Sequence, residues 1–126
     1  SCCIESKESM IKPCQILDKT KLKGGKVQLR FSDGRTLLAQ EGAYKVGDSV
    51  VVDLLAKKVN EHLPLAQGSQ VFLTGGKHKG SMGTVEGIEG RKIIYKVKAN
   101  EIYETLRRYA FVIGTKKPVV KVSAAE

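Results

Sequence analysis

A glycine-rich, doubly basic segment between two short apolar runs constrains the fold of this 126-residue chain more than any other feature. The apolar runs are Val71–Leu73 and Met82–Val85, and three glycines punctuate the segment: Gly76, Gly80 and Gly83. Glycine tolerates positive φ and close backbone approach, so a sharp loop can expose its amides while Lys77 and Lys79 supply positive charge. The segment predicts a strand, a phosphate-facing loop and a second strand.

The spacing of these glycines, with Val85 after them, resembles the KOW motif of ribosomal and transcription-elongation proteins. A glycine-rich hairpin between two core strands explains the glycine spacing alone equally well. A nucleotide-binding phosphate loop fits poorly, because no Ser or Thr follows a Gly-Lys pair at the required offset and no helical pattern follows Gly83.

The charge of the chain favours a polyanionic partner. Lys and Arg number 22 against 13 Asp and Glu, which gives a net charge of +9. Residues 1–64 carry 11 basic and 8 acidic side chains, a net +3, whereas residues 65–126 carry 11 and 5, a net +6. Nucleic acid is therefore the leading partner, although a row of lysines can also be a solvated face.

The three cysteines predict neither a disulfide framework nor a zinc site. Cys2 and Cys3 are adjacent, Cys14 stands apart, and no Cys-x-x-Cys pair occurs. This usage fits a reducing compartment. No apolar run of about 18 residues and no signal segment is present, so membrane insertion and secretion lack support.

Strand signals dominate the first half of the chain. The alternating run over 26–31 places Val27, Leu29 and Phe31 on one face, and the Asp33-Gly34 pair closes a tight hairpin onto residues 36–39. A second hairpin is expected from residues 49–55 through the turn at 56–58 to residues 59–63. A short helical turn is expected at 5–11, ended by Pro13.

Pro64 and the flexible residues after it, up to Gly68, predict a boundary between two small β units. Beyond it we expect strands near 70–74, 82–89, 91–98, 101–106 and 109–113, which imply a small closed barrel. The predicted fold is all-β. Its parts are residues 1–13, at most the remnant of a preceding domain, a central β domain over 14–64, and an SH3-like KOW barrel with a C-terminal tail over 65–126.

Two sets of segments resemble one ribosomal family. The stretch Phe111-Val112-Ile113-Gly114, followed by Lys117-Pro118, is similar to the closing segment of the small-subunit ribosomal protein family S4e. Four earlier segments resemble the central domain of that family and occur in the same order: Phe31–Thr36, Lys45–Ser49, Asp53-Leu54 and Lys58-Val59. The resemblance implies an RNA-binding protein of the small ribosomal subunit. Full-length members carry a further RNA-binding domain ahead of the central one, which nothing here matches, so we expect a fragment.

Lys77, His78 and Lys79 are the first candidates for contact with an RNA backbone. Three consecutive polar side chains on a tight turn cannot all point inward, and each lysine can pair with a phosphate. His78 has no ligand partner at suitable spacing, so we expect it to stack on or hydrogen-bond RNA instead of holding a metal.

Other basic residues are candidates with competing explanations. Arg107 and Arg108 can grip phosphate or stack on a base, or form surface ion pairs with Glu101 or Glu104. Lys21, Lys23 and Lys26 belong to a basic cluster around Gly24-Gly25, for which RNA contact and simple exposure are equally good explanations. The remaining candidates are Lys116 and Lys117.

The sequence contains few residues that could form a catalytic site. His62 and His78 stand isolated, and Asp48 and Asp53 are interpreted as exposed positions beside a turn. Tyr95 is expected in the core with an anchored hydroxyl, and no aromatic clustering predicts a platform for single strands. No catalytic residue, metal ligand or cofactor is predicted.

The sequence thus predicts a structural constituent of the small ribosomal subunit, located in the cytoplasm, that binds ribosomal RNA through basic loops. Neighbouring small-subunit proteins are expected as further partners, and the protein is expected to be monomeric off the ribosome, without a membrane or small-molecule substrate. Two alternatives are a KOW-containing transcription or translation factor that docks on a protein, and a basic accessory domain of an enzyme.

Overall fold

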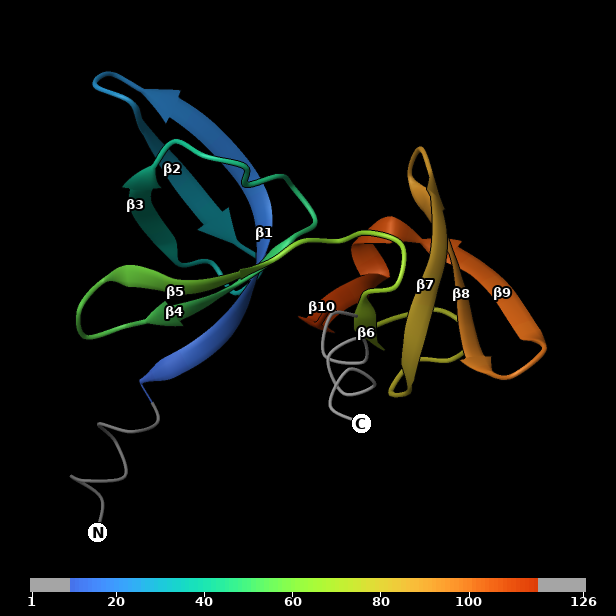
Figure 1. The fold of residues 1–126 in the computed structure, drawn as a ribbon. Coiled ribbons are helices and arrows are strands. Elements are labelled where there is room, and N and C mark those ends of the chain that lie inside the picture. The colour runs from blue at the N-terminus through green and yellow to red at the C-terminus, as the bar shows by residue number, and fades with distance from the viewer. Residues whose placement is uncertain (1–9, 116–126) are drawn as a thin grey trace, which may run out of the picture. The chain divides into compact units, whose positions relative to one another are not determined.

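The computed structural model describes residues 10–115, and in that range it contains ten β-strands and one short 3-10 helix (Figure 1). The strands form two five-stranded antiparallel sheets, which confirms the predicted all-β fold. The chain divides into two compact units between Leu63 and Pro64, here called unit 1 and unit 2.

One long strand organises unit 1, whose sheet order is β3-β2-β1-β4-β5. The N-terminal half of β1, up to Gln15, pairs with β4, and its C-terminal half, from Ile16 on, pairs with β2 with a register shift between Ile16 and Asp18. Two hairpins, β2–β3 and β4–β5, are therefore joined through a single strand. The strands are β1 (Ile11–Leu22), β2 (Lys26–Phe31), β3 (Thr36–Gln40), β4 (Ser49–Asp53) and β5 (Lys58–Leu63).

The core of unit 1 lies where the two hairpins meet β1. Val27, Leu29 and Phe31 are all buried, as their alternation predicted, and each contributes roughly 1.5–3 kcal/mol by leaving water. The rest of this core comes from β1 and β4: Cys14, Ile16, Val50 and Val52.

The turn between β2 and β3 has the predicted chemistry. Gly34 adopts φ +94°, and the backbone N–H of Phe31 donates to the carbonyl of Arg35 at 2.8 Å. The carboxylate of Asp33 accepts the N–H of Arg35 at 2.9 Å, and this hydrogen bond is the largest cause that lowers the pKa of Asp33. The Asp-Gly hairpin is confirmed.

The start of unit 1 differs from expectation. Ile11 belongs to β1 and not to a helical turn, whereas residues 5–9 lie outside the described range. Pro13 lies inside the strand opposite Val51. A proline is tolerated here because this half of β1 pairs only with β4 among the described strands, which leaves an edge where no ladder donor is needed.

Unit 2 has the sheet order β10-β6-β7-β8-β9 and resembles an SH3-like barrel. The five strands lie within a residue or two of the predicted ranges. Within the described part of the chain no ladder joins β9 to β10, and the 3-10 helix η1 connects these two strands along the chain. The elements are β6 (Gln70–Leu73), β7 (Met82–Glu89), β8 (Lys92–Lys98), β9 (Glu101–Leu106), η1 (Arg107–Tyr109) and β10 (Ala110–Gly114).

The thiol of Cys14 should resist alkylation while unit 1 is folded. Cys14 is only 3% exposed, and burial is the largest cause that raises the pKa of its thiol. Because the thiolate is the nucleophile, both effects protect it. In a Cys2→Ser, Cys3→Ser background, labelling by iodoacetamide should be slow in buffer and fast in denaturant. Equal labelling rates would contradict the packing described here.

Candidate nucleic-acid interface

The loop between β6 and β7, residues 74–81, is closed by its own backbone. The N–H of Leu73 donates to the carbonyl of Ser81 at 2.8 Å, and the N–H of Gly80 donates back to Leu73 at the same distance. Two further bonds, from Lys79 to Gly76 at 3.2 Å and from Ser81 to His78 at 3.0 Å, tighten the tip. The loop is a compact hairpin end.

The glycines of the loop serve two different purposes. Gly76 and Gly80 adopt φ +84° and +90°, the left-handed conformation that side chains resist. Gly83 does not adopt a positive φ, and close backbone approach is the property of glycine that matters there. A Cβ on Gly83 would lie 3.1 Å from the carbonyl oxygen of Lys96, and one on Gly75 would lie 2.7 Å from the ring of Tyr109. These two glycines permit close packing.

His78 holds the loop tip onto the sheet of unit 2. Its Nδ1 forms a hydrogen bond with the hydroxyl of Tyr95 at 2.9 Å, and its ring centroid lies 4.3 Å from that of Tyr103. The His78 side chain is therefore half-buried against the protein. Tyr95 is 1% exposed, which agrees with its predicted place in the core with an anchored hydroxyl.

The aromatic cluster formed by His78, Tyr95 and Tyr103 was missed by the sequence analysis. Its members come from the loop, β8 and β9, and Tyr95 and Tyr103 face each other directly across the β8–β9 ladder. Burial raises the pKa of Tyr95, with the neighbouring Tyr103 as the second cause. Desolvation raises the pKa of Tyr103, followed by the charge of Glu101, which accepts its hydroxyl hydrogen at 3.3 Å. Both shifts favour the neutral form of the hydroxyl.

Lys77 and Lys79 are exposed at the tip of this anchored loop. The ammonium of Lys77 lies 5.1 Å from the ring centroid of Tyr103, which is cation–π distance. Within residues 10–115 neither lysine has a carboxylate partner. Both ammonium groups are thus available to an external anion.

Arg107 and Arg108 lie in η1, where the chain passes from β9 to β10. The guanidinium of Arg108 lies 5.3 Å from the ring centroid of Tyr109, and the two arginines line a hollow with Arg91 and Leu106. Glu101 and Glu104, the carboxylates of the competing ion-pair explanation, have contacts of their own: Glu104 pairs with Lys92 at 3.0 Å, and Glu101 accepts a hydrogen bond from Tyr103.

The other candidate residues are dispersed. In unit 1 the turn after β1 holds Gly24 and Gly25 at positive φ, with Lys23 and Lys26 exposed beside it. Lys21 forms an exposed ion pair with Glu41 at 3.0 Å. Lys116 and Lys117 lie outside the described residues.

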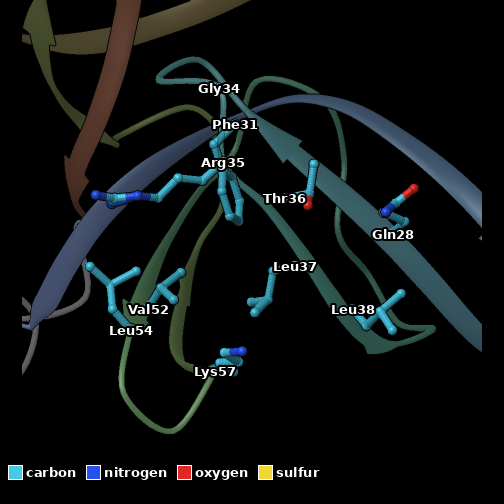
Figure 2. Close-up of a pocket in the computed structure, with 10 residues that line it drawn as sticks. All are labelled: Gln28, Phe31, Gly34, Arg35, Thr36, Leu37, Leu38, Val52, Leu54 and Lys57. Atoms are coloured by element: carbon cyan, nitrogen blue, oxygen red, sulfur yellow. The ribbon is translucent and has the colours of Figure 1, made fainter.

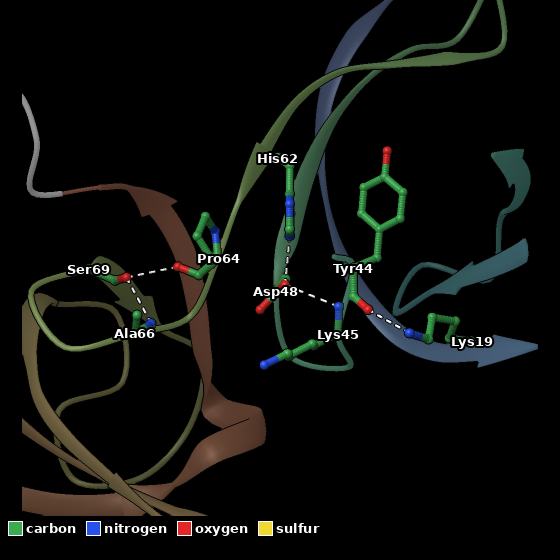
Figure 3. A network of polar contacts seen from close by, with 8 residues as sticks. All are labelled: Lys19, Tyr44, Lys45, Asp48, His62, Pro64, Ala66 and Ser69. Atoms are coloured by element: carbon green, nitrogen blue, oxygen red, sulfur yellow. Dashed lines mark hydrogen bonds and ion pairs between the residues drawn. The ribbon is translucent and has the colours of Figure 1, made fainter. Parts of the chain in front are cut away.

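Asp48 and His62 of unit 1 form a polar pair that the sequence analysis did not expect (Figure 3). Asp48 is 4% exposed, so its interpretation as an exposed turn residue is wrong. Its carboxylate accepts the N–H of Lys45 at 3.1 Å and lies 2.6 Å from Nε2 of His62. The two histidines of the chain, interpreted as isolated, are thus both partnered, His62 by Asp48 and His78 by Tyr95.

Residues 10–115 offer neither a metal site nor a membrane-spanning helix. No group of three His, Cys, Asp or Glu side chains there could hold a metal ion. Among those same residues no helix has the length and apolarity needed to cross a membrane.

Fold and site together define a class: a basic, two-unit all-β protein whose SH3-like barrel carries an anchored, cationic hairpin loop. A family model described as ribosomal family S4e matches residues 1–59. The small ribosomal subunit protein eS4 of Methanocella arvoryzae is 37% identical over 122 residues, which cover 90% of this chain and 50% of that protein. The eS4 protein of Methanocaldococcus jannaschii is 32% identical over 125 residues, which cover 89% of this chain and 51% of that one.

A solved structure agrees with these matches. The crystal structure of the 30S ribosomal protein S4e from Thermoplasma acidophilum superposes with a TM-score of 0.73 at 26% sequence identity, covering 86% of this chain and 57% of that one. The chain belongs to the ribosomal protein family S4e. It spans about half the length of the curated relatives it matches.

Proposed function

We propose that this chain is part of a structural component of the small ribosomal subunit and that it binds ribosomal RNA. The β6–β7 loop is the principal contact, with Lys77 and Lys79 paired to phosphates and His78 holding the loop in place. The proposal is supported by the family membership and by the excess of positive charge in residues 65–126.

The observation that carries the proposal is the exposure of two lysines without carboxylate partners on a loop fixed from both sides. His78 ties the tip to Tyr95, and the N–H of Thr74 donates to the carbonyl of Tyr109 at 2.8 Å. Because the loop is already ordered, little conformational entropy is lost when its lysines meet phosphates. Neutralised phosphates let neighbouring RNA segments approach one another, and the protein recognises RNA shape more than sequence.

This function needs no catalytic chemistry. In the proposed setting the protein works in the cytoplasm as a structural constituent, contacts neighbouring small-subunit proteins and is monomeric away from the ribosome. Retention on purified small subunits at moderate salt is the expected result of a pull-down. Recovery of RNA polymerase without ribosomal RNA would instead favour a transcription factor that docks on protein.

Replacing both Lys77 and Lys79 with alanine should weaken binding to ribosomal RNA and reduce its salt dependence. Each phosphate contact contributes about 0.7–0.9 to the slope of log K against log salt, so the double variant should lose about 1–2 in slope. Filter binding or fluorescence anisotropy from 50 to 300 mM salt, about the range over which the effect is measurable, gives this slope.

A matched control removes two lysines of the same unit that already have partners. Lys92 pairs with Glu104 at 3.0 Å and Lys96 with Glu86 at 3.3 Å. Their replacement by alanine changes the net charge equally but should leave the slope near that of the parent. If both double variants lose the same slope, binding follows net charge and the loop has no special role.

A further inference from the structure

A hollow in unit 1 lies between the β2–β3 hairpin and the β4–β5 hairpin and has an apolar floor. Phe31, Leu37, Val52 and Leu54 form that floor, and Figure 2 shows these side chains gathered around a common space. Leu38 lies at its margin and is 55% exposed, a large apolar surface for a strand residue facing water. The hollow can therefore accept a flat apolar group.

The margin of this hollow is cationic. Arg35 and Lys57 line it from opposite hairpins, and no acidic residue is among its lining side chains. Asp33, which pairs with Arg35 at 3.6 Å and with Lys12 at 3.5 Å, lies outside the lining. A ligand with an apolar body and a negative charge would match this surface.

A second hollow continues the first on the other side of Leu38, which lines both. Lys26 and Lys58 line this second hollow together with Tyr44 and Val59, again without an acidic side chain. The two hollows thus repeat the same pattern of apolar surface and paired cations. A chain of bases joined by phosphates has the same repeat, whereas a peptide would need acidic residues at matching intervals.

We propose that these two hollows, here called the unit 1 groove, bind two successive nucleotides of an unpaired RNA segment. One base enters the hollow floored by Leu37, Val52 and Leu54, and its phosphates pair with Arg35 and Lys57. The side chains of Gln28 and Thr36, which line the same hollow, offer hydrogen-bonding groups to the base edge. The next base contacts Tyr44, between Lys26 and Lys58. This inference rests on the proposed function, because it assigns a further RNA contact to the same protein.

The test separates insertion of a base from simple charge attraction. Leu54→Phe fills the first hollow without changing any charge. Leu55→Phe is the matched control, because Leu55 is the next residue, is 64% exposed and does not line the hollow. The probes are a single-stranded oligoribonucleotide carrying 2-aminopurine and the same sequence annealed into a duplex, each titrated with the full chain.

We expect Leu54→Phe to weaken single-strand binding about tenfold, since a stacked or buried base contributes on that order. The salt slope and the duplex affinity should stay at the parental values, and Leu55→Phe should match the parent throughout. Fluorescence of 2-aminopurine should change on binding to the parent and to Leu55→Phe, but much less with Leu54→Phe. Parental affinity and fluorescence in Leu54→Phe would overturn the inference.

A second variant keeps the test valid if Leu54→Phe disturbs the fold, which circular dichroism would reveal. Lys57→Gln leaves the apolar floor intact, and because Lys57 has no carboxylate partner within residues 10–115 it should lower the single-strand salt slope by about 0.7. An unchanged slope would contradict the proposal. Binding of an acidic, leucine-rich peptide that depends on Leu54, with RNA binding unaffected, would assign the groove to a protein and also overturn it. Failure here leaves the Lys77 and Lys79 result untouched, so the two proposals fail separately.

Discussion

Truncation of Tyr95 to alanine should destabilise unit 2 by about 3–5 kcal/mol, as expected for removal of a fully buried aromatic ring. Tyr95 is 1% exposed, its ring lies 5.8 Å from that of Tyr103, and its hydroxyl is the hydrogen-bond partner of His78. The substitution leaves a cavity under the loop and also releases the loop tip. Stability and RNA binding should therefore fall together.

Tyr95→Phe separates these two effects. It keeps the ring and removes only the bond to His78, so it should cost about 0.5–1.5 kcal/mol. Because the chain divides into two compact units, amide hydrogen exchange read residue by residue in both units is the appropriate measurement. If Tyr95→Ala lowered protection in unit 1 as much as in unit 2, the division of the chain between Leu63 and Pro64 would not describe its cooperativity.

The strands were predictable because local signals determine them. Strict alternation over 26–31 allows only one face to be buried, and the Asp33-Gly34 pair then fixes the reversal that follows. The KOW-like loop was equally accessible, since Gly76 and Gly80 both need the left-handed conformation that glycine alone adopts readily. In these segments sequence and structure agree within a residue or two.

The parts that could not be predicted depend on register between strands. His78 meets Tyr95, 17 residues away, only because β7 and β8 pair so that the loop folds back over the sheet. The need for glycine at position 83 has the same origin. Gly83 lies close to Lys96 because β7 pairs with β8, and the residues next to Gly83 in the sequence do not indicate this contact. Contacts between strands can be predicted only once the pairing of those strands is known.

The anchoring role of His78 also depends on contacts between strands. Three consecutive polar residues on a turn predict that some face outward, but they do not say which one turns inward. Tyr103 lies opposite Tyr95 on β9, and this pair creates the aromatic surface on which His78 rests. Lys77 and Lys79, on either side of His78, remain exposed.

Asp48→Ala should destabilise unit 1 by about 2–4 kcal/mol, because the substitution removes a buried carboxylate and leaves its partners unpaired. Asp48 follows Gly47, whose φ of +101° and hydrogen bond to the carbonyl of Ile16 fix the loop before β4 on β1. Its carboxylate then reaches Nε2 of His62 at 2.6 Å, and the ring of His62 in turn contacts the ring of Tyr44, with 4.9 Å between their centroids. Loss of this pair loosens the junction of β1, β4 and β5.

Ser49→Ala is the matched control, since Ser49 is the next residue and is fully buried. Its hydroxyl is the one buried side-chain polar atom in residues 10–115 without a hydrogen-bond partner, so its removal should change stability by less than about 0.5 kcal/mol or raise it slightly. A double-mutant cycle of Asp48→Ala and His62→Ala, followed by urea unfolding of unit 1, should give a coupling of about 0.5–3 kcal/mol. Additive losses would mean that Asp48 stabilises the loop without help from His62.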